Sequence, residues 1–331
     1  MFRPWAGLLL VPSLCLAQSA PTATAATPLR LAGTVFGDTA EVEVRDLERA
    51  RAQSALAAAW QLLSDSAAAA AQLEAPGAGA GVARPLAPEE LRWLARTGAF
   101  CAWSDGAMSA LGGSVHRLWG TSSPVGEIPT RARLEPAIDA ARCERLRIDE
   151  SARRFELAAG STLDLRHFAR GWAVDRAVEA LRARGARNLW VRVGPVARAA
   201  GGGPDGRGWR FELPLFAGLE QPLRALRLID QAVAVADSSA APIRIAGERF
   251  SPYVDLRSGR PASGVSGVVV VTALAGDAQP LAAALFVFGA NAGQMRLGVL
   301  RPKPAVLWLL GSSESGAPVL ATSNWSAVKK Q

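Results

Sequence analysis

The sequence predicts a mixed α/β fold of the α+β class, formed by one domain over residues 31–328. Strand-like segments come in groups with single helices between them, without the strict strand–helix alternation of a parallel sheet. Half of the residues are apolar, which is enough for a sizeable core. No internal repeat or long linker divides the chain.

The N-terminus has the layout of a secretory signal peptide. A positive charge precedes an apolar run at 5–16, and small residues follow. We expect a signal peptide over 1–20, cleaved near Ala17 or Ala20, and a flexible leader over 21–30. The run is shorter than the roughly 20 apolar residues of a membrane span. The expected product is exported and periplasmic, has no transmembrane segment, and is a monomer or weak dimer.

The elements of the domain follow from periodicity and from terminal residues. Alternation over 31–44 predicts a strand, and apolar spacing over 47–63 predicts a helix before an Ala/Gly/Pro-rich loop at 66–84. Pro88 begins a second helix, and a third follows Thr130. The later elements are a hairpin of 145–149 and 154–158, a helix over 168–184 ended by Gly185, strands at 188–193, 208–215, 223–229, 231–236, 243–246 and 265–274, a short helix over 280–288 closed by Gly289, and strands at 305–310 and 318–321.

Charge and cysteine content limit the partners. The net charge is +8, but the arginines are scattered among acids and no basic stripe is interleaved with aromatic residues, so nucleic acid is not an expected partner. Cys101 and Cys143 remain after removal of the leader. An oxidising compartment permits a disulfide between them, but two buried thiols are the simpler expectation.

Five segments, in this order and at these spacings, carry a family resemblance. They are Gly33-Thr34, 104–109 (SDGAMS) with Leu118-Trp119-Gly120, 164–175 (DLRHFARGWAVD), 255–261 (DLRSGRP) and 278–285 (AQPLAAAL). Together they resemble the ApbE family, the FAD:protein FMN transferases.

The resemblance implies an enzyme that uses FAD and Mg²⁺ and attaches FMN to a Thr or Ser of a flavoprotein, which can belong to a redox complex. The positions that it implies for FAD binding are Ala107, Met108, Ser109, Asp164, Arg170 and Tyr253. The positions that it implies for the metal are the backbone carbonyl of His167 and the side chains of Gln279 and Ala283.

The metal positions depart from the family pattern. Gln279 is a neutral amide where the family has Asp, and Ala283 offers no side-chain oxygen where the family has Thr. Magnesium requires hard oxygen ligands, above all carboxylates. We therefore expect a transferase-like protein that has lost its activity, and no catalytic residue is assigned. The alternative is a non-catalytic periplasmic protein that binds a flavin or another phosphate ligand, or a protein partner.

Basic residues near these positions suggest a second hypothesis. Arg166, His167, Arg170 and Arg192 fall at positions that the family places around its cleft. A guanidinium group can donate two parallel hydrogen bonds to two oxygens of one phosphate, and it stays charged at physiological pH. The cleft is then either a basic anion site that works without metal, or a site whose arginines are solvated or paired with neighbouring acids.

Overall fold

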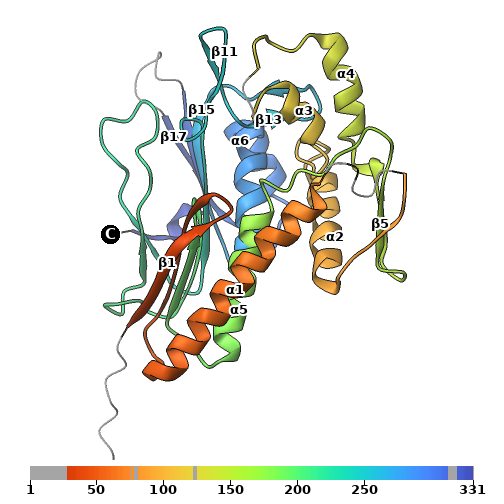
Figure 1. The fold of residues 1–331 in the computed structure, drawn as a ribbon. Helices are drawn as coiled ribbons and strands as arrows, with labels where there is room; N and C mark the ends of the chain where they lie inside the picture. Colours follow the sequence, from red (N-terminus) through yellow and green to blue (C-terminus); the bar gives the residue numbers. More distant parts are fainter. Residues whose placement is uncertain (1–27, 76, 78–80, 122–124, 312–318, 331) are drawn as a thin grey trace, which may run out of the picture.

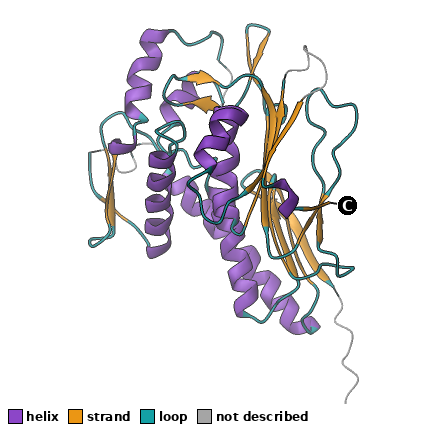
Figure 2. Cartoon of the chain, turned by 180° about the vertical axis from the view of Figure 1, so that it is seen from behind, coloured by secondary structure: helices purple, strands orange, loops and turns teal. Residues whose placement is uncertain are grey.

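The computed structural model describes residues 28–75, 77, 81–121, 125–311 and 319–330. The predicted mixed α/β class is confirmed. One eight-stranded sheet, antiparallel throughout, forms the centre of the molecule, and the long helices gather on one side of it (Figures 1 and 2). In spatial order its strands are β1 (Leu29–Val35), β2 (Asp38–Val44), β6 (Leu189–Val193), β7 (Val196–Ala200), β10 (Ala232–Asp237), β15 (Val265–Thr272), β16 (Ala305–Leu310) and β17 (Val319–Ser323).

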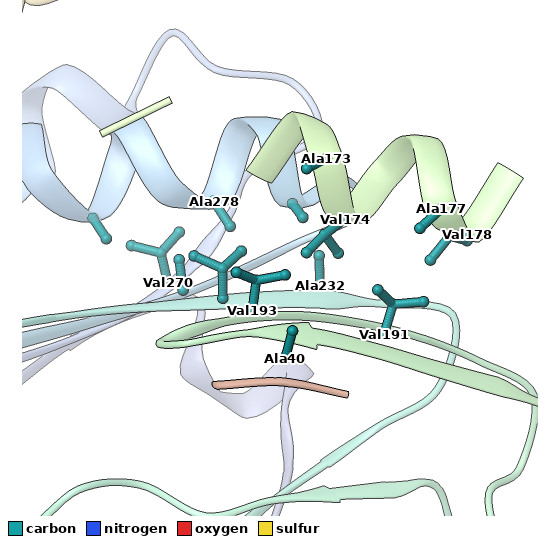
Figure 3. Packing of buried hydrophobic residues seen from close by; sticks show 14 of the residues in the cluster. Ala40, Ala173, Val174, Ala177, Val178, Val191, Val193, Ala232, Val270 and Ala278 are labelled. Carbon is teal, nitrogen blue, oxygen red and sulfur yellow. The ribbon is translucent and has the colours of Figure 1, made fainter. Parts of the chain in front are cut away.

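The main core lies between this sheet and three helices, α1 (Arg49–Leu73), α5 (Ala169–Ala183) and α6 (Ala275–Leu297). Their buried faces are rich in alanine, so the helix axes come close to the sheet. Burying one valine side chain contributes about 1.5–3 kcal/mol relative to leaving it exposed. Figure 3 shows this packing, with Ala173, Val174, Ala177 and Val178 of α5 and Ala278 of α6 above Ala40, Val191, Val193, Ala232 and Val270 of the sheet.

Helix α6 is interrupted at Gly289. This residue has φ 67° and ψ −175°, a conformation that side-chain-bearing residues avoid. The turn brings Gly293 against the side chains of Leu285 and Trp308, where an added Cβ would lie 3.1 Å and 2.9 Å from their atoms. The predicted helix over 280–288 with its Gly289 stop is thus the central part of a longer, bent element.

The other face of the sheet is covered by a three-stranded sheet. It consists of β8 (Trp209–Phe211), β9 (Leu226–Leu228) and β18 (Lys329–Lys330), and its apolar side chains pack on Trp190, Val233 and Leu307.

A smaller group of elements lies beyond the helices. It consists of α2 (Pro88–Trp103), α3 (Gly113–Leu118), α4 (Arg131–Ala140), η1 (Cys143–Arg145), and the ribbons β3 (Arg84–Pro85) with β5 (Arg154–Leu157) and β4 (Leu146–Asp149), β11 (Ile243–Ile245) with β12 (Glu248–Phe250), and β13 (Val254–Asp255) with β14 (Arg260–Pro261). The remaining short helix is η2 (Trp325–Ala327).

Several predicted elements need correction. The strand predicted over 31–44 is a hairpin, because Phe36 and Gly37 adopt positive φ and turn the chain between β1 and β2. The first helix continues to Leu73, since the alanine-rich segment predicted as loop has the strongest helix propensity. Strand β7 and helix α3 were not predicted. The strands expected at 208–215 and 223–229 shrink to three residues each.

The predicted signal peptide lies outside the described residues, as does the leader up to residue 27. The leader was expected to reach residue 30, but β1 begins at Leu29, and β18 extends beyond the expected limit of 328. Within the described ranges, no helix combines the length and the apolarity that crossing a membrane requires.

A disulfide joins Cys101 at the end of α2 to Cys143 of η1. Their Cα atoms are 5.8 Å apart, and 42 residues separate them in sequence. Of the two alternatives that the sequence left open, the structure has the bridge. It connects the helix that precedes the 104–109 segment to the segment that follows α4.

Loss of this bridge is expected to lower stability substantially. Closing a loop of this length removes about 4 kcal/mol of unfolded-state entropy in the loop-closure model. Replacing both cysteines by alanine should lower the free energy of unfolding by a comparable amount, measured by urea denaturation of the oxidised protein. The wild-type protein in dithiothreitol is the control and should behave like the variant. An unchanged unfolding midpoint under both conditions would contradict the prediction.

Candidate functional site

The site is organised where the first turn of α5 crosses the first turn of α6, near the centre of Figure 1. Gly171 makes this crossing possible, because a Cβ at this position would lie 2.4 Å from the carbonyl oxygen of Ala275. The carboxylate of Asp175 accepts hydrogen bonds from the backbone N–H groups of Ala275 (3.0 Å) and Gly276 (2.8 Å), and so caps α6. The buried Arg198 of β7 donates to the same carboxylate at 3.0 Å. Sheet, α5 and α6 are therefore tied together at one carboxylate.

Gln279 bridges the two helices at this crossing. Its Oε1 accepts from the backbone N–H of Gly171 at 2.8 Å, and its Nε2 donates to the backbone carbonyl of Arg166 at 2.8 Å. Only this orientation of the amide matches a donor with an acceptor on each side. The side chain is 8% exposed, so both hydrogen bonds are shielded from water.

These residues do not fit a magnesium ion. The carbonyl that meets Gln279 is that of Arg166, one residue before the expected His167, and the amide N–H group already occupies it. Ala283 is buried among apolar side chains and supplies no oxygen. Asp277, the nearest carboxylate in sequence, is paired with Arg96. No cluster of three or more His, Cys, Asp or Glu side chains suited to a metal occurs in the described part of the chain.

Asp164 is the centre of a buried polar network. Its carboxylate lies 2.8 Å from Nδ1 of His116 and accepts from Nε of Arg166 at 2.8 Å. Burial by itself raises the pKa of Asp164, but the hydrogen bond and charge of His116 and the guanidinium of Arg166 hold it far below its usual range. His116 is thus a buried partner of a predicted site residue.

Arg170 is held by the β1–β2 turn. Its Nε and Nη2 lie 2.7 Å and 2.6 Å from Oδ2 of Asp38, and the guanidinium carbon is 5.9 Å from the ring centroid of Phe36. Its Nη1 also donates to the carbonyl of Arg166 at 3.2 Å. Asp38 had no recognisable signal in the sequence, because it is the first residue of β2 and lies far from Arg170 along the chain.

The hypothesis of a four-residue basic cleft is only partly compatible with this arrangement. Arg166 and Arg170 are each paired with a carboxylate, as the alternative expected, although Asp38 was not among the acids considered. Arg192 is not at the cleft. It donates to the carbonyl of Gly194 and lies 5.5 Å from the ring of Phe211, which belongs to the cluster on the opposite face of the sheet.

His167 and Tyr253 form the aromatic part of the site. Their ring centroids are 5.4 Å apart and their planes are inclined by 30°, and the Tyr253 hydroxyl accepts from the backbone N–H of Asp237. Nε2 of His167 is shielded from solvent without a hydrogen-bond partner. Burial, and then the positive charges of His116 and Arg166, lower the pKa of His167 to about 3. Its imidazole is therefore neutral at physiological pH.

The segment with Ala107, Met108 and Ser109 adjoins this network. The Ser104 hydroxyl accepts a hydrogen bond from the backbone N–H of Met108 at 3.1 Å. Ala107, Met108 and Ser109 are all buried. The carbonyl of Ala110 accepts a hydrogen bond from the backbone N–H of Asp164 at 2.7 Å. The carbonyl of Ala107 accepts one from the backbone N–H of Leu256. The structure thus brings together all six positions that the resemblance implied for FAD, whereas sequence reasoning missed Asp38 and the role of His116.

Removing the Gln279 bridge should destabilise the protein. Gln279→Ala leaves the buried N–H of Gly171 without a partner, and the Arg166 carbonyl keeps only the bond from Arg170. One unsatisfied buried group should cost about 1–3 kcal/mol of unfolding free energy. The measurement is chemical denaturation at neutral pH. Gln279→Glu is the matched control for shape, and its carboxylate oxygen would face the Arg166 carbonyl without a proton to donate. A Gln279→Glu variant as stable as the wild type would contradict the donor role.

His167 should give stability a specific pH dependence. Its pKa is about 6.5 in the unfolded chain and about 3 in the folded protein. The unfolded state therefore binds one more proton between these values, and stability falls as pH decreases through this window. His167→Gln should reduce the slope there by about 1.4 kcal/mol per pH unit. Both proteins share the carboxylates, so the difference between their pH–stability curves isolates the histidine. Parallel curves would refute the assignment.

Comparison with known proteins agrees with this geometry. The family model described as the ApbE family matches residues 36–306. Two proteins named FAD:protein FMN transferase are similar. The protein of Haemophilus influenzae is 24% identical over 235 residues, which cover 69% of this chain and 66% of that protein. The protein of Vibrio cholerae is 26% identical over 200 residues, which cover 57% of this chain and 58% of that protein. This chain therefore matches 66% and 58% of these relatives' lengths, in both cases less than two thirds.

A solved structure extends the agreement to the fold. The apo form of the flavinyl transferase ApbE of Pseudomonas stutzeri superposes with a TM-score of 0.75 and 21% identity, covering 91% of this chain and 96% of that one. Since the family match includes most of the chain and both helices of the crossing, this protein belongs to the ApbE family.

Proposed function

We propose that this protein is an exported, periplasmic member of the ApbE family that binds FAD without a metal ion and no longer transfers FMN to protein. The observation that carries the proposal is the bridge made by Gln279, whose amide hydrogen-bonds both Gly171 and Arg166. The names of the curated relatives support a flavin nucleotide as the ligand.

Loss of transfer follows from the charge that the reaction generates. Cleaving the pyrophosphate of FAD builds negative charge on phosphate oxygens, and a divalent cation normally neutralises it. At the crossing of α5 and α6, the two family metal positions hold a neutral amide and a methyl group. An amide donates one hydrogen bond to the Arg166 carbonyl but adds no positive charge, so it stabilises the fold without replacing the catalytic role of the cation.

Retention of binding is supported by the rest of the site. The 107–109 segment, Asp164 and Tyr253 remain grouped, and the neutral imidazole of His167 has a nitrogen without a partner. Arg170 is one of the predicted FAD positions, but a phosphate that reached it would compete with Asp38. We therefore infer weak binding that is independent of Mg²⁺. Such a protein would act as a binding component for a flavoprotein or redox complex.

The proposal predicts a specific pattern of activity. The mature protein, incubated with FAD and Mg²⁺, should release no AMP in a chromatographic assay, and EDTA should leave FAD binding unchanged in a fluorescence titration. Asp38→Asn should tighten that binding by up to about fivefold, the magnitude of one exposed ion pair.

A double variant, Gln279→Asp with Ala283→Thr, tests the metal position directly. It should acquire a melting temperature that Mg²⁺ raises, whereas Mg²⁺ should not affect the wild type. The Haemophilus influenzae relative is the positive control for AMP release. Mg²⁺-dependent AMP release by the wild-type protein would overturn the loss of transfer, and an absence of FAD binding would overturn the binding role.

A further inference from the structure

A cavity opens beside α6, on the side that faces away from Gln279. Its volume is about 660 Å³, and it lies between α2, the first half of α6, the ends of β10, β15 and β16, and the segment 300–304. Asp277 and Leu281 of α6 line it. Since successive helical residues are rotated by about 100°, these positions point away from Gln279 and Ala283. The cavity is therefore separate from the predicted FAD site.

The walls of this cavity are mainly apolar. Phe100 and Trp103 of α2 face it together with Val271, Leu281 and Leu300. Leu274, at the start of α6, also lines it and is 37% exposed. A volume between about 300 and 1,000 Å³ with apolar walls and a few polar groups is typical of sites for small molecules. A ligand with an apolar body would remove these side chains from water, which stabilises the complex.

The charges around the cavity leave a positive excess. Of the two carboxylates that line it, Asp277 is paired with Arg96, and Asp230 lies 3.7 Å from Arg182. Arg301 also lines it, and its Nη1 donates to the backbone carbonyls of Gly298 and Leu300 rather than to an acid. The exposed Lys303 makes no ion pair with any carboxylate of the described residues. An anionic group at this edge would therefore meet two cations that no acid neutralises.

We propose that this cavity binds a small amphipathic anion, with an apolar chain or ring next to Phe100 and Trp103 and a carboxylate or similar group at Lys303. Two independent observations support this class of ligand, the apolar walls and the unpaired cations at one edge. Binding of this ligand and binding of FAD occupy different faces of α6. The site would give the protein a second ligand besides the flavin nucleotide.

Isothermal titration calorimetry with three amphiphilic probes tests the class of ligand. Decanoate, decanol and decyltrimethylammonium have alkyl chains of nearly equal length and differ chiefly in the head group. Decanoate should bind most tightly, decanol about fivefold more weakly, and the cation more weakly still. Equal affinities for the three probes, or no heat of binding with decanoate, would overturn the proposal.

Two pairs of variants test the location. Ala99 is an exposed residue of α2 that lines the cavity, so Ala99→Trp should fill it and weaken decanoate binding at least tenfold. Ala102 is exposed on the same helix outside the cavity, and Ala102→Trp should leave binding unchanged. Lys303→Gln should weaken decanoate binding about fivefold without affecting decanol, whereas Arg244→Gln removes the same charge elsewhere and should have no effect. Unaltered binding in Ala99→Trp with a wild-type melting temperature would place the probe elsewhere and refute the site.

Discussion

The close approach of α5 to α6 is the constraint on which the rest of the site depends. It requires a residue without a side chain at Gly171, because the carbonyl of Ala275 occupies the space that a Cβ would need. Asp175 then fixes the approach by capping α6 and accepting from the buried Arg198. Breaking a buried ion pair of this kind typically costs about 3–5 kcal/mol. The same crossing brings Gln279 to within hydrogen-bond distance of two backbone groups, so the scaffold and this predicted metal position are one structural unit.

The polar groups of the site satisfy one another. Arg166 pairs with Asp164, Arg170 pairs with Asp38, and the Gln279 amide uses both its donor and its acceptor. A site built for a divalent cation would leave carboxylates with excess negative charge. Here the charges are balanced by protein groups, and His167 contributes a neutral imidazole. With its charges balanced in this way, the site can keep its shape without a metal ion. An anionic ligand that binds Arg166 or Arg170 must displace the carboxylate that the arginine already contacts.

Most of the fold was predictable, because helix and strand periods are local properties of the sequence. The family-like motifs also identified the positions that meet at the site. The failures concern long-range contacts. No local pattern shows that Asp38 will meet Arg170, or that Cys101 and Cys143 will come within bonding distance. The misplacement of Arg192 has a different cause. Arg192 alternates along β6 with Val191 and Val193, which face the helices, so its side chain lies on the opposite face of the sheet. This placement follows only once the direction of β6 is known.

The disulfide and the sheet make different demands on the folding chain. Both cysteines lie in the first half of the sequence, so in an oxidising compartment the peripheral helices can be joined before the strands β6 to β17 have paired. By contrast, β2 must wait for β6, since Ala40 pairs with Val193. The hairpin of β1 and β2 therefore keeps an open edge until β6 has paired with it, and non-local pairing of this kind is slow. The disulfide would hold the peripheral helices together while β1 and β2, the first strands of the chain, still lack their neighbour β6.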